Sequence, residues 1–149
     1  MKKLLLTLSL LTLSSCAYAS INNSNSACSY ASINLATIAK IESSGNPLAI
    51  GDNGKALGLF QLHKEVIFDF NKAHGTNYRH KDVFKDDIAY KIANWYINFE
   101  IVRLLKYFKK PVTLENQITA YNMGIGSVLK GRKAVKYIAK YNKLNKGVK

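Results

Sequence analysis

Apolar residues recur at helical spacing in the first third of the chain. Every third residue over 35–41 is Leu or Ile, on one helix face with Glu42. This spacing predicts a helix, with Ser32 as its N-cap. The helix should end at the Gly-Asn-Pro sequence over 45–47, because a proline disfavours helical geometry in the residue before it.

A turn and a second helix are predicted next. Residues 48–56 show no period, and Asn53-Gly54 within them is typical of a tight turn or a short hairpin. Apolar residues then predict a helix from near Leu57 to about Lys72, followed by a polar loop over 73–83.

The longest periodic segment covers residues 85–108. Asp86 and Asp87 stand in its first turn, where negative charge is favourable for the helix dipole, and 109–111 (Lys-Lys-Pro) ends it. Its expected core stripe consists of Ile88, Ile92, Trp95, Phe99, Val102 and Leu105.

Two shorter helices complete the pattern. Thr113 caps a helix that should run through Tyr121, and Gly124 and Gly126 should break it. A basic helix follows over about 132–144. The sequence therefore predicts a mainly α single domain with at most a short β-hairpin.

The N-terminus has the order of an export signal. Two lysines precede an apolar run over 4–13, and a small-x-small cleavage site stands at 17–19. The run is too short to cross a bilayer as a helix, which takes about 20 residues. We expect residues 1–19 to be a signal peptide, 20–31 a flexible lead-in rich in Ser and Asn, and 32–149 the functional domain.

Two alternatives to simple secretion stay open. Residues 13–16 (Leu-Ser-Ser-Cys) resemble a lipoprotein cleavage box, which would leave a lipidated Cys16 as the first residue. The other alternative is that the apolar run is not a signal but an N-terminal membrane anchor or a buried helix. In either processing route Cys28 has no partner left inside the mature chain. The cysteines and histidines show no metal-ligand spacing, so we expect no metal and no cofactor.

The chain is strongly basic. Its formal charge is +13, from 22 Lys and Arg against 9 Asp and Glu, and it falls to +11 when Lys2 and Lys3 are removed with the signal. Nucleic acid, anionic lipid and an anionic cell wall all fit this charge, and so does a simple solvated surface. No nucleic-acid-binding motif accompanies the lysines, so we expect no nucleic-acid partner.

Glu42 is the first candidate for chemistry. It lies at the C-terminal end of an apolar helix face, where desolvation and the negative end of the helix dipole both raise a carboxyl pKa. A carboxyl group that stays protonated near neutral pH can donate a proton to a leaving glycosidic oxygen. The structural alternative is an ion pair with a nearby lysine such as Lys40.

Four short motifs stand in order around this residue. They are Ile41-Glu42-Ser43-Ser44-Gly45-Asn46-Pro47, Gly58-Leu59-Phe60-Gln61, Ala120-Tyr121-Asn122-Met123-Gly124 and Tyr137-Ile138. Over roughly residues 33–142 this set resembles the soluble lytic transglycosylases (SLT domain) of the lysozyme-like superfamily. Phe60 replaces the usual Met of that family, and Met123 replaces the usual Ala. The small size is most similar to specialised forms that open the wall for secretion systems, conjugation or phage.

The resemblance implies roles at the matched positions. Glu42 would be the catalytic acid and then the base. Ser43 and Gln61 would hold substrate near it. Three residues would shape the cleavage point: Tyr121 and Asn122 by lining it, and Tyr137 by packing and hydrogen-bonding beside Glu42.

The implied reaction cuts the β-1,4 bond between N-acetylmuramic acid (MurNAc) and N-acetylglucosamine (GlcNAc) in peptidoglycan. No water is consumed, because the substrate's own C6 hydroxyl attacks and leaves a 1,6-anhydro-MurNAc end. One carboxyl group is enough for this route, whereas most glycosidases use two. Asp52 is the only other acid in the stretch 42–61, which fits a one-carboxylate mechanism.

Other functions are compatible with the same residues. A hydrolase similar to goose-type lysozyme would share the fold and the single Glu. A non-catalytic wall-binding scaffold and a cationic membrane-active or nucleic-acid-binding protein are the alternatives from other classes. As partners we expect peptidoglycan glycan strands together with a secretion, conjugation or pilus apparatus, and we expect a monomer. The expected location is the periplasm or cell envelope, after export.

Overall fold

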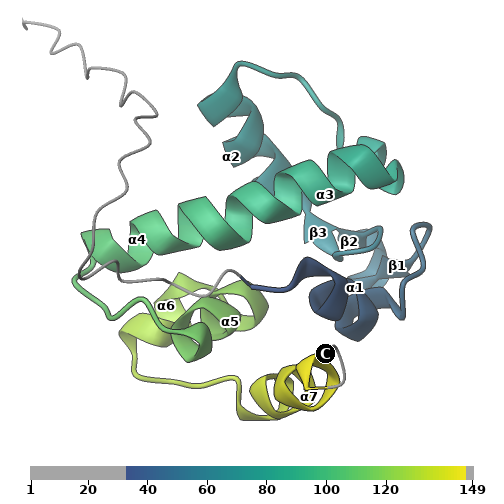
Figure 1. Cartoon of the computed structure of the whole chain (residues 1–149). Helices are drawn as coiled ribbons and strands as arrows, with labels where there is room; N and C mark the ends of the chain where they lie inside the picture. The colour runs from purple at the N-terminus through teal and green to yellow at the C-terminus, as the bar shows by residue number, and fades with distance from the viewer. Residues whose placement is uncertain (1–32, 147–149) are drawn as a thin grey trace, which may run out of the picture.

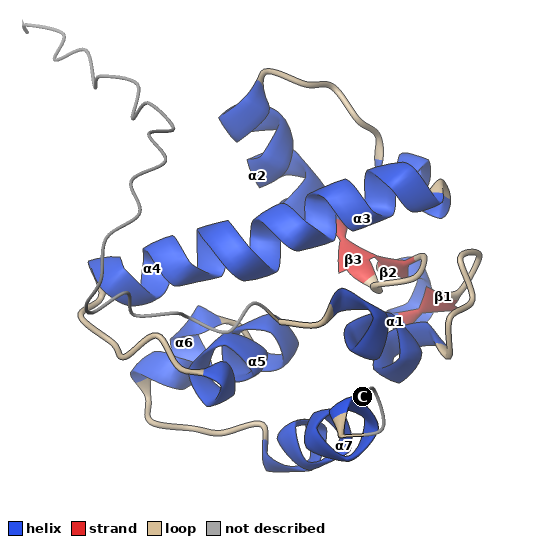
Figure 2. Cartoon of the chain, viewed as in Figure 1, coloured by secondary structure: helices blue, strands red, loops and turns tan. Residues whose placement is uncertain are grey.

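The computed structural model describes residues 33–146, so the predicted signal peptide and lead-in lie outside the described part. This part is mainly helical with one small antiparallel sheet, which confirms the predicted fold class (Figure 1, Figure 2). None of its helices is long and apolar enough to cross a membrane. The strands are β1 (Ile50–Gly51), β2 (Ala56–Leu57) and β3 (Leu62–His63). The helices are α1 (Leu35–Ser43), α2 (Lys64–His74), α3 (Asp86–Trp95), α4 (Ile101–Tyr107), α5 (Leu114–Met123), α6 (Ile125–Leu129) and α7 (Val135–Asn145), with the 3₁₀ helices η1 (Asp52–Gly54) and η2 (His80–Phe84) and the π-helical turn η3 (Tyr96–Glu100).

The first helix, α1, carries Glu42 near its C-terminal end. Asn34 is its N-cap, since the Asn34 side chain accepts a hydrogen bond from the Thr37 amide at 3.2 Å. The prediction of Ser32 is therefore wrong by two positions, because Ser and Asn cap about equally well and the apolar spacing does not choose between them. The helix ends where Ser44 takes a left-handed φ of 57°, next to the predicted stop.

The predicted hairpin forms, but the second helix begins later than predicted. The three strands pair antiparallel in chain order, with Ile50 opposite Leu57. The prediction of a helix from Leu57 is wrong, because Gly58 (φ 74°) and Gln61 (φ 47°) have left-handed backbone that a right-handed helix excludes. The helix α2 begins only at Lys64.

Gly58 lets the chain of η2 lie directly on this hairpin. A Cβ atom at Gly58 would stand 2.6 Å from the carbonyl oxygen of Val83. The position therefore needs glycine both for its positive φ and for the close approach. Phe60, one of the apolar residues that suggested a helix, is buried in the core from this irregular segment instead, together with Leu62.

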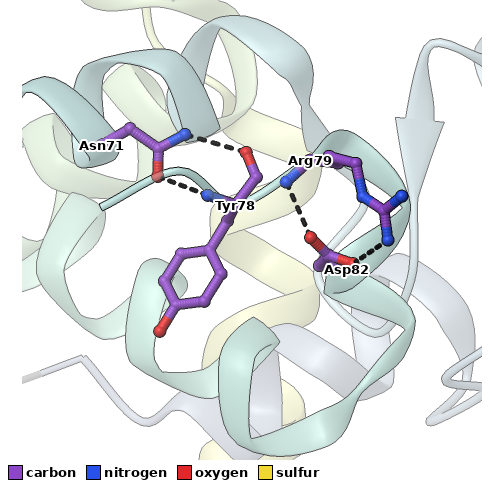
Figure 3. Close-up of polar contacts among 4 residues, drawn as sticks. All are labelled: Asn71, Tyr78, Arg79 and Asp82. Carbon is purple, nitrogen blue, oxygen red and sulfur yellow. Dashed lines mark hydrogen bonds and ion pairs between the residues drawn. The ribbon is translucent and has the colours of Figure 1, made fainter.

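The segment after α2 is held by side chains at both ends (Figure 3). Asn71 donates to the Tyr78 carbonyl at 2.8 Å and accepts from the Tyr78 amide at 3.0 Å. Asp82 accepts from the Arg79 amide at 2.7 Å and so caps η2. The polar loop predicted over 73–83 is therefore shorter than expected, with α2 reaching into its start and η2 occupying its end.

One continuous helix, formed by α3, η3 and α4, crosses the molecule, with α2 on one side and α5 and α6 on the other (Figure 1). Its buried apolar residues are Ala89, Ile92, Ala93, Ile97, Ile101 and Leu105. Most of them recur every four residues, a spacing that drifts by about 40° per repeat on an α-helix. The π-helical turn has more residues per turn than an α-helix, so it reduces this drift. Phe99, predicted in the core stripe, is 61% exposed, because the prediction assumed an unbroken α-helical period.

The C-terminal helices close the fold around α1. Thr113 caps α5 as predicted, and Gly124, with φ 77°, ends that helix. Gly126 does not break the chain but lies inside α6, a short helix that the sequence pattern does not predict. The last helix, α7, packs against α1. Its buried Tyr141 accepts a hydrogen bond from the Asn34 amide at 2.9 Å, whereas Val135 at its start is exposed.

Candidate active site

A cleft of about 560 Å³ opens between the hairpin segment, α2, η3 and α5. Four of the six residues that the sequence predicts for the site line it, namely Glu42, Gln61, Tyr121 and Asn122. Ser43 and Tyr137 do not line the cleft. Both instead hydrogen-bond to groups that form its wall.

Glu42 is half-buried at the end of α1, with its carboxyl group facing the cleft. Burial raises its pKa above the usual 4.5, against the opposing effects of the Tyr137 hydrogen bond and the charges of Lys140 and His63. The direction agrees with the expectation from the sequence, and its largest cause is desolvation. Within the described chain Glu42 forms no ion pair with Lys40 or with any other lysine, so the structural alternative does not hold.

Tyr137 fixes the position of this carboxyl group. Its hydroxyl, carried by α7, donates to Glu42 Oε1 at 2.6 Å. Burial and the Glu42 charge together raise the pKa of Tyr137 far above its usual value, so the phenol stays a neutral donor. On the same helix the Lys140 ammonium donates to the Ile41 carbonyl at 3.3 Å, where a cation also suits the C-terminal end of α1.

Ser43 and Gln61 tie the first two motifs together. The Ser43 hydroxyl donates to the Leu59 carbonyl at 2.9 Å, across 16 positions of the chain. The Gln61 amide nitrogen donates to the carbonyls of Gly58 at 2.9 Å and Ala49 at 3.3 Å. Both donors are therefore committed to the segment that forms one cleft wall. The Gln61 Oε1 lies against Gly51, which leaves room for it by having no side chain. Direct substrate contact by Ser43 and by Gln61 stays a prediction.

Tyr121 joins the third motif to the second. Its hydroxyl donates to the Phe60 carbonyl at 2.6 Å, and its ring lines the cleft. Burial, then the charge of Glu42, then Tyr96 raise the pKa of Tyr121 well above its usual value. The neighbouring Asn122 lies in the cleft lining, and its side-chain amide bonds to no other residue of the described part. Asn122 is thus free to bind a ligand.

The sequence reasoning did not place four polar residues in the cleft: Tyr96, Asp52, His63 and Glu65. Tyr96, from the π-helical turn, lines it beside Tyr121, with ring centroids 6.1 Å apart. Asp52 and His63 form an exposed pair in the lining, with His63 Nε2 3.7 Å from Asp52 Oδ2. No spacing in the sequence marks Tyr96, and the left-handed backbone at Gln61 breaks any extended alternation that would have pointed from Gln61 to His63.

Among residues 33–146 no group of three or more His, Cys, Asp or Glu side chains could hold a metal ion. What the cleft offers is one buried carboxyl group beside aromatic rings and free amide and hydroxyl groups. That combination suits proton transfer to a neutral, hydroxyl-rich ligand.

One protein family matches this chain. The family model for the transglycosylase SLT domain matches residues 20–144, which is most of the chain. No curated protein and no solved structure matches it. The family match contains all four motifs, and its fold is the lysozyme-like helical domain described above. The chain therefore belongs to the transglycosylase SLT domain family.

Proposed function

We propose that this protein is a peptidoglycan lytic transglycosylase. It cleaves the β-1,4 bond between MurNAc and GlcNAc without water and leaves 1,6-anhydro-MurNAc ends. The observation that carries the proposal is Glu42, a cleft carboxyl group with a raised pKa that Tyr137 orients. Membership of a family of peptidoglycan-acting transglycosylases supports the substrate class.

The reaction runs in two proton transfers through one group. Protonated Glu42 donates its proton to the glycosidic oxygen while the bond from that oxygen to C1 of MurNAc breaks. The resulting carboxylate then takes the proton of the MurNAc C6 hydroxyl as its oxygen bonds to C1. The second step returns Glu42 to its protonated form, so the cycle needs neither water nor a second catalytic acid.

Two other carboxyl groups lie in the cleft lining, Asp52 and Glu65. Both are exposed, and Asp52 faces His63 at the cleft edge. Among the three carboxyl groups of the lining only Glu42 is partly withdrawn from solvent, and this burial raises its pKa. The raised pKa of Glu42 therefore supports it as the proton donor.

Hydrolysis on the same fold is the second candidate, and Asp52 is the observation that favours it. A carboxylate in the same cleft as the acid could activate a water molecule, as the second carboxylate of an inverting glycosidase does. His63 Nε2, 3.7 Å from Asp52 Oδ2, would then help to position this carboxylate. The two candidates differ in the sugar end that they produce.

The proposed setting is the cell envelope. The export signal predicted over 1–19 would bring the chain to the periplasm, with Cys16 as the lipid anchor if the lipoprotein route is used. A formal charge of +13 favours an anionic wall. The proposed role is local wall opening for a secretion, conjugation or pilus apparatus.

Release of soluble fragments from purified peptidoglycan sacculi tests the activity. The wild-type protein should solubilise sacculi, and Glu42→Gln should lower the rate by at least about 10²-fold, because loss of general acid catalysis costs that much or more. Glu115→Gln is the matched control, since this exposed carboxyl group on α5 only pairs with Lys133 at the surface. A wild-type rate in Glu42→Gln would refute the assignment.

A further inference from the structure

The π-helical turn η3 interrupts the long helix where that helix meets the cleft. The Ile101 amide donates to the Tyr96 carbonyl, five residues back, instead of to the Ile97 carbonyl, four residues back. The Ile97 carbonyl thereby loses its ordinary helical donor. A turn of this kind is rare and often occurs at functional sites.

Buried Gln117 makes the turn tenable. Its Nε2 donates to the Ile97 carbonyl at 3.3 Å, from α5, and its side chain is almost inaccessible to solvent. Gln117 thus replaces the helical donor that the Ile97 carbonyl has lost, and this avoids the free-energy cost of an unsatisfied buried carbonyl. Because Gln117 stands one turn before Tyr121, the same contact ties η3 to the motif that lines the cleft.

Tyr96 opens the π-helical turn and projects into the cleft. Its ring lies beside those of Tyr121, at 6.1 Å, and Trp95, at 6.4 Å. Its hydroxyl bonds to no other residue in the described part of the chain. An aromatic ring with a free hydroxyl presents an apolar face to the C–H groups of a pyranose and a hydrogen bond to its polar substituents.

Tyr96 and Tyr121 stand side by side in the cleft lining, with ring centroids 6.1 Å apart. The Tyr121 hydroxyl is committed to the Phe60 carbonyl, so within the described residues Tyr96 brings the free hydroxyl of this pair. Burial first, and then the charges of Asp69 and Glu100, raise the pKa of Tyr96, so the phenol stays a neutral donor.

We propose that Tyr96, held by the π-helical turn that Gln117 completes, binds an N-acetylated sugar of the glycan strand beside Tyr121 in the cleft that Glu42 lines. This inference rests on the proposed function for the identity of the strand. The hydroxyl donates to a sugar hydroxyl or to the acetamido carbonyl, and the ring covers the sugar face.

Titration with a GlcNAc tetramer, which is neutral and carries no peptide, tests this site. In a Glu42→Gln background, which prevents turnover, calorimetry should give a Kd that Tyr96→Phe raises about threefold to tenfold, the effect of one lost hydrogen bond. Tyr96→Leu, which also removes the ring, should raise it further. Tyr107→Phe is the matched control, because Tyr107 is 73% exposed on α4 and outside the cleft lining.

The possible outcomes separate the sugar site from the proposed lytic function. An unchanged Kd in both Tyr96 variants overturns the inference, and so does a background protein that binds no tetramer, provided its thermal melt shows it folded. If the wild-type protein leaves sacculi intact while tetramer binding still depends on Tyr96, the proposed lytic function fails and the sugar site stands. If sacculi are solubilised and the Tyr96 substitutions leave the Kd of the tetramer unchanged, the proposed function stands and the inference fails.

Discussion

Tyr137 and Glu42 stand 95 positions apart in the sequence and share a hydrogen bond of 2.6 Å. The bond links the last helix to the first, so the docking of α7 on α1 sets the geometry of the reacting carboxyl group. It also opposes the effect of burial, because a donor to the carboxylate stabilises its charged form. Burial and the Tyr137 hydrogen bond thus act in opposite directions on the pKa of Glu42, and a single substitution can shift this pKa.

The Tyr137→Phe substitution should move the pH dependence of activity. Without the donor the Glu42 pKa rises further, so the protonated, active form persists to higher pH. The alkaline limb of the pH profile of kcat/KM should shift upward, together with a lower maximum rate from the less ordered carboxyl group. Turbidity clearance of sacculi across a pH series measures both. A limb that stays in place or moves to lower pH would contradict the assignment of this limb to Glu42.

Stability should depend on pH through the same residue. The folded-state pKa of Glu42 is above its unfolded value of 4.5, so between these two values the folded chain holds a proton that the unfolded chain has lost. The free energy of unfolding therefore falls as pH rises through that window, and the stability is fully present below it. Glu42→Gln should remove this contribution and become the more stable protein at neutral pH. Urea unfolding at pH values on both sides of the window measures this. An equal pH dependence of stability in both proteins would contradict a raised pKa of Glu42 in the folded state.

The sequence predicted those elements whose ends carry capping or breaking residues in regular helical context. Thr113 caps α5 and Gly124 ends it as expected. The second helix was misplaced because the apolar residue Phe60 looks helical, while the left-handed backbone at Gln61 has no signal in its residue type. The π-helical turn could not be foreseen either, since its support, Gln117, comes from another helix.

A pair of glycine substitutions tests that account of the hairpin. Gly58→Ala and Gly54→Ala place the same side chain at φ 74° and φ 85°, but only the first meets an atom, the Val83 carbonyl oxygen at 2.6 Å. Gly54→Ala should cost only the conformational penalty of about 1–2 kcal/mol. Gly58→Ala should cost clearly more, because η2 must move away. Equal losses of unfolding free energy in chemical denaturation would show that the close approach has no energetic weight.

Two neighbouring residues of the third motif should separate activity from stability. Asn122→Ala removes a free cleft amide and should lower kcat/KM roughly tenfold to a hundredfold, with little change in melting temperature. Tyr121→Phe should lower the melting temperature as well, because its hydroxyl holds the Phe60 carbonyl. Both quantities are measured on the same preparations. A loss of stability without loss of activity in Asn122→Ala would make that residue part of the scaffold.

The motifs located the cleft, and the structure adds what each group does there. Glu42, Gln61, Tyr121 and Asn122 meet as predicted because their motifs lie at the ends of packed elements. The hydroxyl groups of Ser43 and Tyr121 turn out to bind backbone carbonyls. Their direction depends on contacts across the fold, which residue type and spacing do not encode.

The sugar ends left by the protein test the central claim most directly. Sacculi are digested in water enriched in ¹⁸O, and the muropeptides are identified by mass spectrometry. The account predicts 1,6-anhydro-MurNAc ends, each lighter than a reducing end by one water and free of ¹⁸O, since the C6 hydroxyl is the nucleophile and Glu42 the only acid and base. Reducing MurNAc ends that carry ¹⁸O would contradict it and identify the protein as a hydrolase.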